Sequence, residues 1–194
     1  MKDQFRTLTL IIFAALLVSV AACGGGDQED SSDSPDEQQT ISSQTPGTGE
    51  CVFEVNADCS GLDLSYQDLS AVVAPGINLR GANLTGVVLD GAMLIGAKLT
   101  GAQLSGASLA HTNLSAATLS QIQATGAIFF ETNLSHADLI QANLSAAIFI
   151  QTDLRSANLT GSIIEGLVDR RTFKCGTLWS DGTLVNSSCE TSSN

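Results

Sequence analysis

The stretch from Gly81 to Ala110 reads GANLTGVVLDGAMLIGAKLTGAQLSGASLA and carries a leucine at every fifth position. Neither regular secondary structure would bury such a row. In an α-helix, successive leucines would lie about 140° apart, and in a strand they would alternate between the two faces. A period of five instead indicates a short extended segment followed by a corner, repeated so that the corners close a coil.

The row of central apolar residues extends well beyond this stretch, from Leu64 to Ile164. Its 21 repeats carry Leu, Phe or Ile at the central position in all but two cases. A second period, of twenty residues, is also visible, because ETNLS at 131–135 echoes HTNLS at 111–115 and QTDLR at 151–155. A three-sided coil would break these echoes, so the sequence favours a coil with four sides of five residues each.

The pentapeptides GANLT, SANLT, QANLS and HADLI resemble the motif Ala-(Asp/Asn)-Leu-x-x of the pentapeptide-repeat family. The resemblance covers Gly61 to about Gly166. It implies an all-β fold, a right-handed quadrilateral β-helix, and the 21 repeats correspond to about five coils. The cysteine pairs that flank the repeats add disulfide-bonded end caps to this expectation. Two segments depart from the motif, 71–76 and 121–125, where Ala replaces the central Leu. We expect local bulges there.

The N-terminus has the features of an export signal. A basic start precedes an apolar run of fifteen residues from Leu8 to Ala22, which is shorter than the roughly 20 residues of a membrane-spanning helix and typical of a signal peptide. Val20-Ala21-Ala22-Cys23 resembles the lipobox of bacterial lipoproteins, and this resemblance implies that Cys23 is the site of lipid attachment. Gly24 follows in place of the Asp that favours inner-membrane retention, which implies an outer-membrane lipoprotein facing the periplasm or the cell surface.

The segment from Gly24 to Glu50 contains no Leu, Val, Phe or basic residue. With so few apolar residues the segment cannot form a core, so we expect a disordered acidic tether here. The expected organisation is a signal peptide at 1–22, the lipidated Cys and tether at 23–50, an N-terminal disulfide cap at 51–60, the repeats at 61–166 and a C-terminal hairpin cap at 167–194.

Two cysteines flank the repeats at each end. Cys51 and Cys59 precede them, and Cys175 and Cys189 follow, around an Asp181-Gly182 pair typical of a hairpin turn. The ends of a five-coil solenoid lie too far apart for bonds that need Cα atoms within about 7 Å. We therefore expect Cys51 to pair with Cys59 and Cys175 with Cys189, in an oxidising periplasm.

Charge and motifs exclude several function classes. The chain has a formal net charge of −12, which argues against nucleic-acid binding. No Ser, His and Asp converge in the repeats, and no metal-binding spacing occurs, so we predict no enzyme, no cofactor and no metal. His111 stacks beside Glu131 at an outward corner, which predicts a surface ion pair.

The resemblance to the pentapeptide-repeat family leaves two candidate functions. The favoured one is a non-enzymatic, membrane-anchored envelope lipoprotein whose solenoid is a rigid interaction or scaffold module for a protein or glycan partner, or for a second copy. The alternative is a DNA mimic that binds topoisomerases, as some family members do. Export disfavours it, and so does the weak charge of the repeats, where residues 61–165 carry seven acids and three bases.

One side of the coil carries apolar residues where the family pattern points outward, on either side of the central residue. We predict an interaction patch of Val88, Ile128, Phe130, Ile148 and Ile150. A second interpretation is that the C-terminal hairpin folds back over this patch through Trp179 and Leu184. We favour the contact surface, because adjacent exposed apolar groups ringed by polar residues are typical of an interface.

Overall fold

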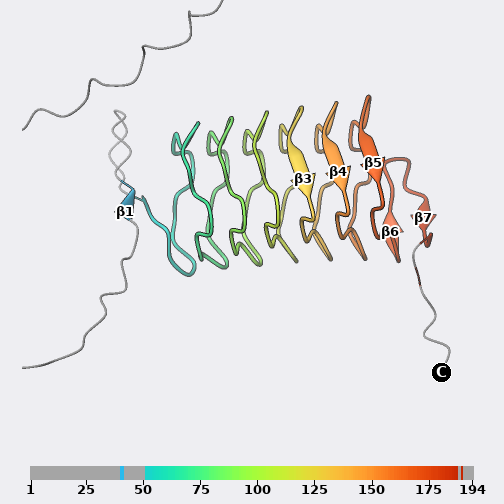
Figure 1. The fold of residues 1–194 in the computed structure, drawn as a ribbon, viewed down its shortest axis with the longest axis horizontal. Coiled ribbons are helices and arrows are strands. Elements are labelled where there is room, and N and C mark those ends of the chain that lie inside the picture. Colours follow the sequence, from blue (N-terminus) through green and yellow to red (C-terminus); the bar gives the residue numbers. More distant parts are fainter. Residues whose placement is uncertain (1–39, 42–50, 188, 190–194) are drawn as a thin grey trace, which may run out of the picture. The chain divides into compact units, whose positions relative to one another are not determined.

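The computed structural model describes residues 40–41, 51–187 and 189 of the chain (Figure 1). They belong to one compact unit, Gln38–Asn194. The predicted signal peptide, Cys23 and most of the predicted tether lie outside the described residues. Among the described residues there is no helix long and apolar enough to cross a membrane.

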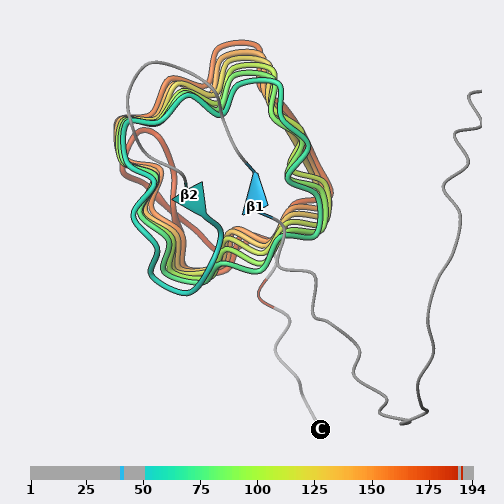
Figure 2. The ribbon, with the colours of Figure 1, turned by 90° about the vertical axis from the view of Figure 1, so that its left-hand side faces the viewer.

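The described chain forms a four-sided coil with twenty residues per turn. Residues twenty apart pair in parallel, and the column that starts with Asp58 and Asn78 continues at this interval to Leu178. The coil therefore makes six turns, one more than the sequence predicted, and it continues past the boundary that we drew at residue 166. Figure 2 shows the stacked turns end-on, with their four corners superimposed.

Seven short strands are present in the described residues. In one side of the coil, three parallel strands pair in register, in the order β3-β4-β5. Two antiparallel pairs lie at the ends of the described chain: β1 with β2, which places a strand inside the predicted tether, and β6 with β7. The bounds are β1 Thr40–Ile41, β2 Cys51–Val52, β3 Ile128–Phe130, β4 Ile148–Ile150, β5 Val168–Arg170, β6 Thr177–Leu178 and β7 Leu184–Val185.

Each corner is a β-turn closed by the backbone. The central carbonyl accepts a hydrogen bond from the N–H three residues later, as from Ala82 N to Leu79 O at 3.1 Å. The third residue of the turn has a positive φ, 63° at Gly81 and 57° at His111. The Asn or Asp of the motif supports the same turn, because its side chain accepts a hydrogen bond from the N–H two residues on, as Asn113 Oδ1 does from Ser115 N at 3.1 Å.

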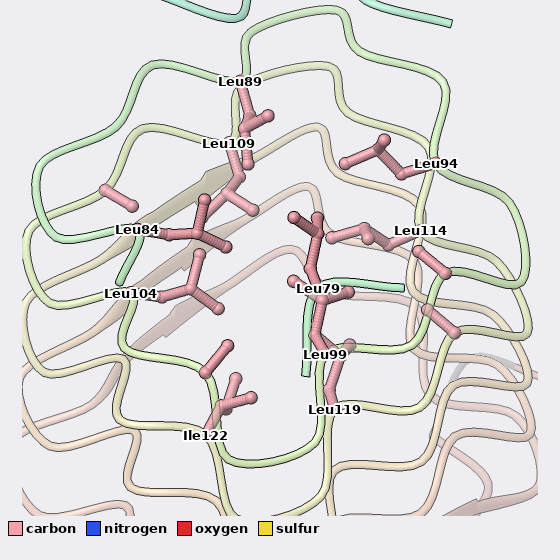
Figure 3. Packing of buried hydrophobic residues seen from close by; sticks show 14 of the residues in the cluster. Leu79, Leu84, Leu89, Leu94, Leu99, Leu104, Leu109, Leu114, Leu119 and Ile122 are labelled. Carbon is pink, nitrogen blue, oxygen red and sulfur yellow. The ribbon is translucent and has the colours of Figure 1, made fainter. Parts of the chain in front are cut away.

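The core is the central row together with the small residue two places before it. Figure 3 shows the central leucines of successive turns pointing into the coil from all four sides. Phe129 and Phe149 replace Leu on one side and pack edge to face, with ring centroids 4.8 Å apart. Where Thr replaces the small Ala, the buried hydroxyl finds a partner: Thr132 Oγ1 donates to Leu109 O at 2.7 Å.

The bulges expected at 71–76 and 121–125 do not occur. Ala74 and Ala124 are fully buried, and the preceding residues keep their bridges, Val73 to Met93 and Gln123 to Asn143. A shorter inward side chain changes the packing but leaves the backbone ladder intact. The neighbouring Pro75 still accepts a ladder hydrogen bond through its carbonyl, from Asn56 N at 2.9 Å.

The last turn ends the apolar row with charge. Asp169 and Lys174 occupy central positions and form an ion pair, and the Lys174 Nζ lies 4.6 Å from the ring centroid of Trp179. Trp179 in turn packs against the buried core. The C-terminal end of the core is thus covered by an ion pair and an indole ring.

Candidate interaction surface

Five large apolar side chains lie on the outer surface of the β3-β4-β5 sheet, and we call them the apolar sheet face. The in-register pairing aligns them in two columns along the coil. Ile128 is 40% exposed and Val168 37%, while the other three are half-buried. The face consists of Ile128 and Phe130 on β3, Ile148 and Ile150 on β4, and Val168 on β5.

This surface contains four of the five residues predicted from the sequence. Val88, the fifth, lies on the same side of the coil, but Ser108 separates it from Ile128 in their shared column. Val168 was missed because it lies beyond the boundary drawn at residue 166. Its place twenty residues after Ile148 is the signal that would have found it.

The C-terminal hairpin does not cover the apolar sheet face among the described residues. β6 stacks on Asn158 through Leu178, and this column lies two sides away from β4, on the opposite side of the coil. Trp179 packs on the end of the core instead, and Leu184 is 61% exposed. The interpretation in which the hairpin folds back over the patch is therefore wrong.

One edge of the apolar sheet face is lined by corner residues with polar side chains, which we call the rim row: His111, Glu131, Gln151 and Arg171. All four have positive φ, between 51° and 57°. His111 Nδ1 lies 3.2 Å from Glu131 Oε2, the pair expected from their spacing, and the His111 ring meets Phe130 edge to face at 5.4 Å. The opposite edge is formed by small corner residues, such as Gly126 and Gly166, so the face is open on that side.

A second exposed apolar group was not anticipated. Val73 is 56% exposed, Met93 44% and Ile95 39%, and Val73 bridges directly to Met93. They lie on the adjacent side of the coil, near its N-terminal end. The signal for this group was present in the outward positions, where Val, Met and Ile replace the Asn, Asp, Ser or Thr of most repeats.

Polar features elsewhere are structural in kind. At the N-terminal end, hydrogen bonds from the Ser65 side chain and backbone lower the pKa of Asp63. Burial raises the pKa of Asp153, but its hydrogen bonds from Arg155 outweigh this and lower the pKa overall. Among the described residues no group of His, Cys, Asp and Glu side chains is arranged to hold a metal ion.

The Asp153–Arg155 pair lines an open groove of about 800 Å³, together with Arg171 and Phe173. Asp153 already holds the Arg155 guanidinium through two nitrogens. Among the described lining residues, Arg171 is therefore the only charged group without an ion-pair partner. The lining residues that the structure describes form a shallow groove and contain no nucleophile paired with a general base.

Each pair of flanking cysteines forms a local bond. Cys51 is bonded to Cys59, with Cα atoms 5.4 Å apart, and Cys175 to Cys189, with Cα atoms 4.8 Å apart. The second bond joins the last turn of the coil to the segment after β7. Cys23, the predicted lipid attachment site, lies outside the described residues.

Comparisons with known proteins agree with this geometry. The model of the family described as pentapeptide repeats matches in eight copies, at residues 68–101, 76–109, 94–129, 107–145 and 127–166. This match and the four-sided parallel ladder confirm the expected quadrilateral β-helix. No curated protein matches the chain.

Several solved structures are similar to the chain. HetL, a pentapeptide repeat protein involved in heterocyst differentiation regulation from the cyanobacterium Nostoc sp. strain PCC 7120, is 26% identical, with 66% of this chain and 78% of that one covered and a TM-score of 0.30. A pentapeptide repeat protein from the Arabidopsis thaliana thylakoid lumen is 31% identical over 49% and 66% of the two chains, with a TM-score of 0.38. QnrB1, a plasmid-mediated fluoroquinolone resistance protein, is 15% identical over 69% and 78%, with a TM-score of 0.40.

Proposed function

Because the chain belongs to the pentapeptide-repeat family, we propose that it works without catalysis, as a membrane-anchored lipoprotein of the bacterial envelope whose rigid solenoid presents an apolar face to a protein partner. Proteins of this family are generally structural or interaction modules rather than enzymes. The observation that carries the proposal is the apolar sheet face, which no described segment of the chain covers.

The apolar sheet face is suited to protein contact by its composition and its rigidity. Its side chains are large and adjacent, whereas soluble proteins seldom leave such groups exposed without a function. Behind them the rings of Phe129 and Phe149 are fully buried and packed on each other. A partner would therefore meet a preformed surface, and little ordering entropy would oppose the contact.

The membrane anchor is supported by the sequence alone. The lipobox from Val20 to Cys23 follows an apolar run of signal-peptide length, and the acidic segment after it separates the anchor from the solenoid. Sixteen residues, 24–39, lie between Cys23 and the first strand, β1, and a chain of that length reaches at most about 53–58 Å. The apolar sheet face would then be held within reach of other envelope proteins.

A DNA mimic would need acidic outer faces, and the charge of this coil argues against one. Residues 61–165 carry seven acids and three bases. Exposed apolar residues interrupt three of the four sides: Ile128 and Val168 on the apolar sheet face, Val73, Met93 and Ile95 on the next side, and Ile163 on a third. An outer surface interrupted in this way lacks the continuous acidic face that a DNA mimic would need.

The contact is tested by placing charge on the face. In cells that produce the full chain, Phe130→Asp combined with Ile150→Asp should abolish its cross-links to envelope proteins or to itself, while the circular dichroism of the purified variant stays that of the wild type. Val73→Asp combined with Ile95→Asp is the matched control, because it charges outward apolar residues on another side. Unchanged cross-links in the first variant would refute the assignment of the face.

The anchor is tested separately. Cys23→Ala should abolish incorporation of labelled palmitate and leave the precursor uncleaved, since the acylated thiol is removed. A wild-type chain that takes up no label and fractionates with the cytosol would contradict the envelope assignment and leave the contact face as a property of the solenoid alone.

A further inference from the structure

We propose that the partner on the apolar sheet face is a second copy of this chain, docked antiparallel about a two-fold axis that passes beside Gln151. The inference rests on the proposed function, which assigns this face to protein contact, and it names the occupant. It is carried by the order of charges in the rim row and by the order of apolar residues next to it.

The rim row is self-complementary about Gln151. Glu131 and Arg171 lie on the same corner of the coil, one turn of twenty residues before and one turn after Gln151. A two-fold axis in the plane of the face, perpendicular to the solenoid, exchanges these two levels while it keeps the same rim. Glu131 of one copy then faces Arg171 of the other, and the symmetry makes this pair twice.

The same axis matches the apolar residues. Ile148 and Ile150 on β4 lie at the level of the axis and face their own copies, and Ile128 faces Val168 of the second copy. Phe130 faces Arg170, which β5 carries in the same column, and a guanidinium over an aromatic ring is a favourable contact. No member of the apolar sheet face is left opposite an unmatched group.

The parallel arrangement lacks this match. An axis that runs along the solenoid would keep each level and exchange the two edges of the face. Glu131 would then lie opposite Gly126, and Arg171 opposite Gly166, so that neither charge would have a partner. The side chain of Glu131 is 41% exposed beside His111, and it is therefore accessible to Arg171 of a second copy in the antiparallel register.

The register is tested by cross-linking at the axis. Gln151→Cys in the full chain should form a covalent dimer on mild oxidation, because the two side chains face each other. Gln141→Cys is the matched control, since Gln141 is also a glutamine at a corner, with a φ of 57° against 54° at Gln151, but it lies on the diagonally opposite corner. Non-reducing electrophoresis should show dimer for Gln151→Cys only. Equal cross-linking of both variants would overturn the register.

Charge reversal gives an independent measurement. Glu131→Arg alone and Arg171→Glu alone should each raise the dimer dissociation constant, measured by sedimentation, by about tenfold or more, because like charges then meet twice. The double variant should recover the wild-type constant to within a few-fold. Both residue types already occur at corners of this coil, so folding, checked by circular dichroism, should be unaffected. A double variant as weak as the single ones would refute the pairing.

The outcomes separate this inference from the proposed function. A wild-type chain that is monomeric at millimolar concentration, yet loses an envelope cross-link in the Phe130→Asp, Ile150→Asp variant, would overturn the second copy as occupant and keep the contact face. A monomeric chain with no cross-link to lose would overturn both.

Discussion

Two regions of the coil build the same corner from different residues. From residue 76 to residue 106 all seven successive corner residues are glycine, whereas from 111 to 156 only Gly126 is glycine among ten. Positive φ costs an L-residue about 1–2 kcal/mol, so the second region carries strain that the first avoids. The backbone ladder is nevertheless continuous through both.

The strained corners hold side chains that the glycine corners lack. His111 pairs with Glu131 in the next turn, and Gln121 donates to Gln141 at 3.2 Å. One edge of the apolar sheet face, the rim row, is formed by corners of this kind. The difference indicates that the buried Leu and Ala rows maintain the fold, and that corner strain is tolerated where a side chain is useful on the surface.

The largest effect is expected inside the second region, where Phe replaces Leu on one side of the coil. Phe149→Ala should lower the free energy of unfolding by about 3–5 kcal/mol, since it leaves a cavity and removes the ring contact with Phe129. Leu89→Ala, on the same side in the glycine region, should cost less because it breaks no ring pair. Denaturant titrations of both variants measure this, and equal losses would contradict a special role for the aromatic pair.

A corner exchange tests the strain directly. Gly106→Ala should destabilise the protein by about 1 kcal/mol, and Ala116→Gly should stabilise it by about 0.5 kcal/mol, because the φ penalty is added in one case and removed in the other. A Cβ at Gly106 would meet nothing within 4 Å, so the effect is one of backbone conformation alone. Shifts of the same sign in both variants, measured by denaturant titration, would show that the corners are not strained.

The smallest effect concerns acid stability at the N-terminal end, where Asp63 supports its turn as Asn143 does further along. Hydrogen bonds from Ser65 hold the pKa of Asp63 below the ordinary value of 3.8, so its contribution is full above that pH and is lost as the pH falls through the lowered pKa. Asp63→Asn should therefore flatten the decline of unfolding free energy below about pH 4, and Asn143→Asp should steepen it. Parallel pH profiles for all three proteins would contradict this.

Much of the fold was predictable because the coil closes every twenty residues and the sequence repeats with that interval. The end of the coil was not, since Asp169 and Lys174 interrupt the apolar row by which the repeats were recognised. Their pairing with each other allows charged residues to occupy inward positions. The column of outward residues from Asp58 to Asn158 continues to Leu178 at the same interval of twenty residues. This interval would have predicted both the additional turn and the side of the coil on which the hairpin lies.

The candidate surface was predictable to the extent that it depends on stacking. Ile128 and Ile148 were found because their spacing of twenty residues places them together, and Val88 was included although a polar Ser108 intervenes. The group at Val73 and Met93 was not predicted, because Val73 stands beside Ala74, in a repeat that departs from the motif and for which a bulge was expected. Whether an outward side chain is exposed also depends on the segments that flank the repeats, and the repeat pattern does not predict where those segments lie.

The covered C-terminal end of the core also decides how this protein can polymerise. Identical coils stacked end to end would extend into a filament, since the unpaired backbone N–H and C=O groups at one end could bond to those at the other end of the next molecule. Here an incoming coil would have to bury the Asp169–Lys174 pair beneath it, and desolvating charges is costly. Growth along the axis is therefore blocked at this end, which favours a solenoid of fixed length.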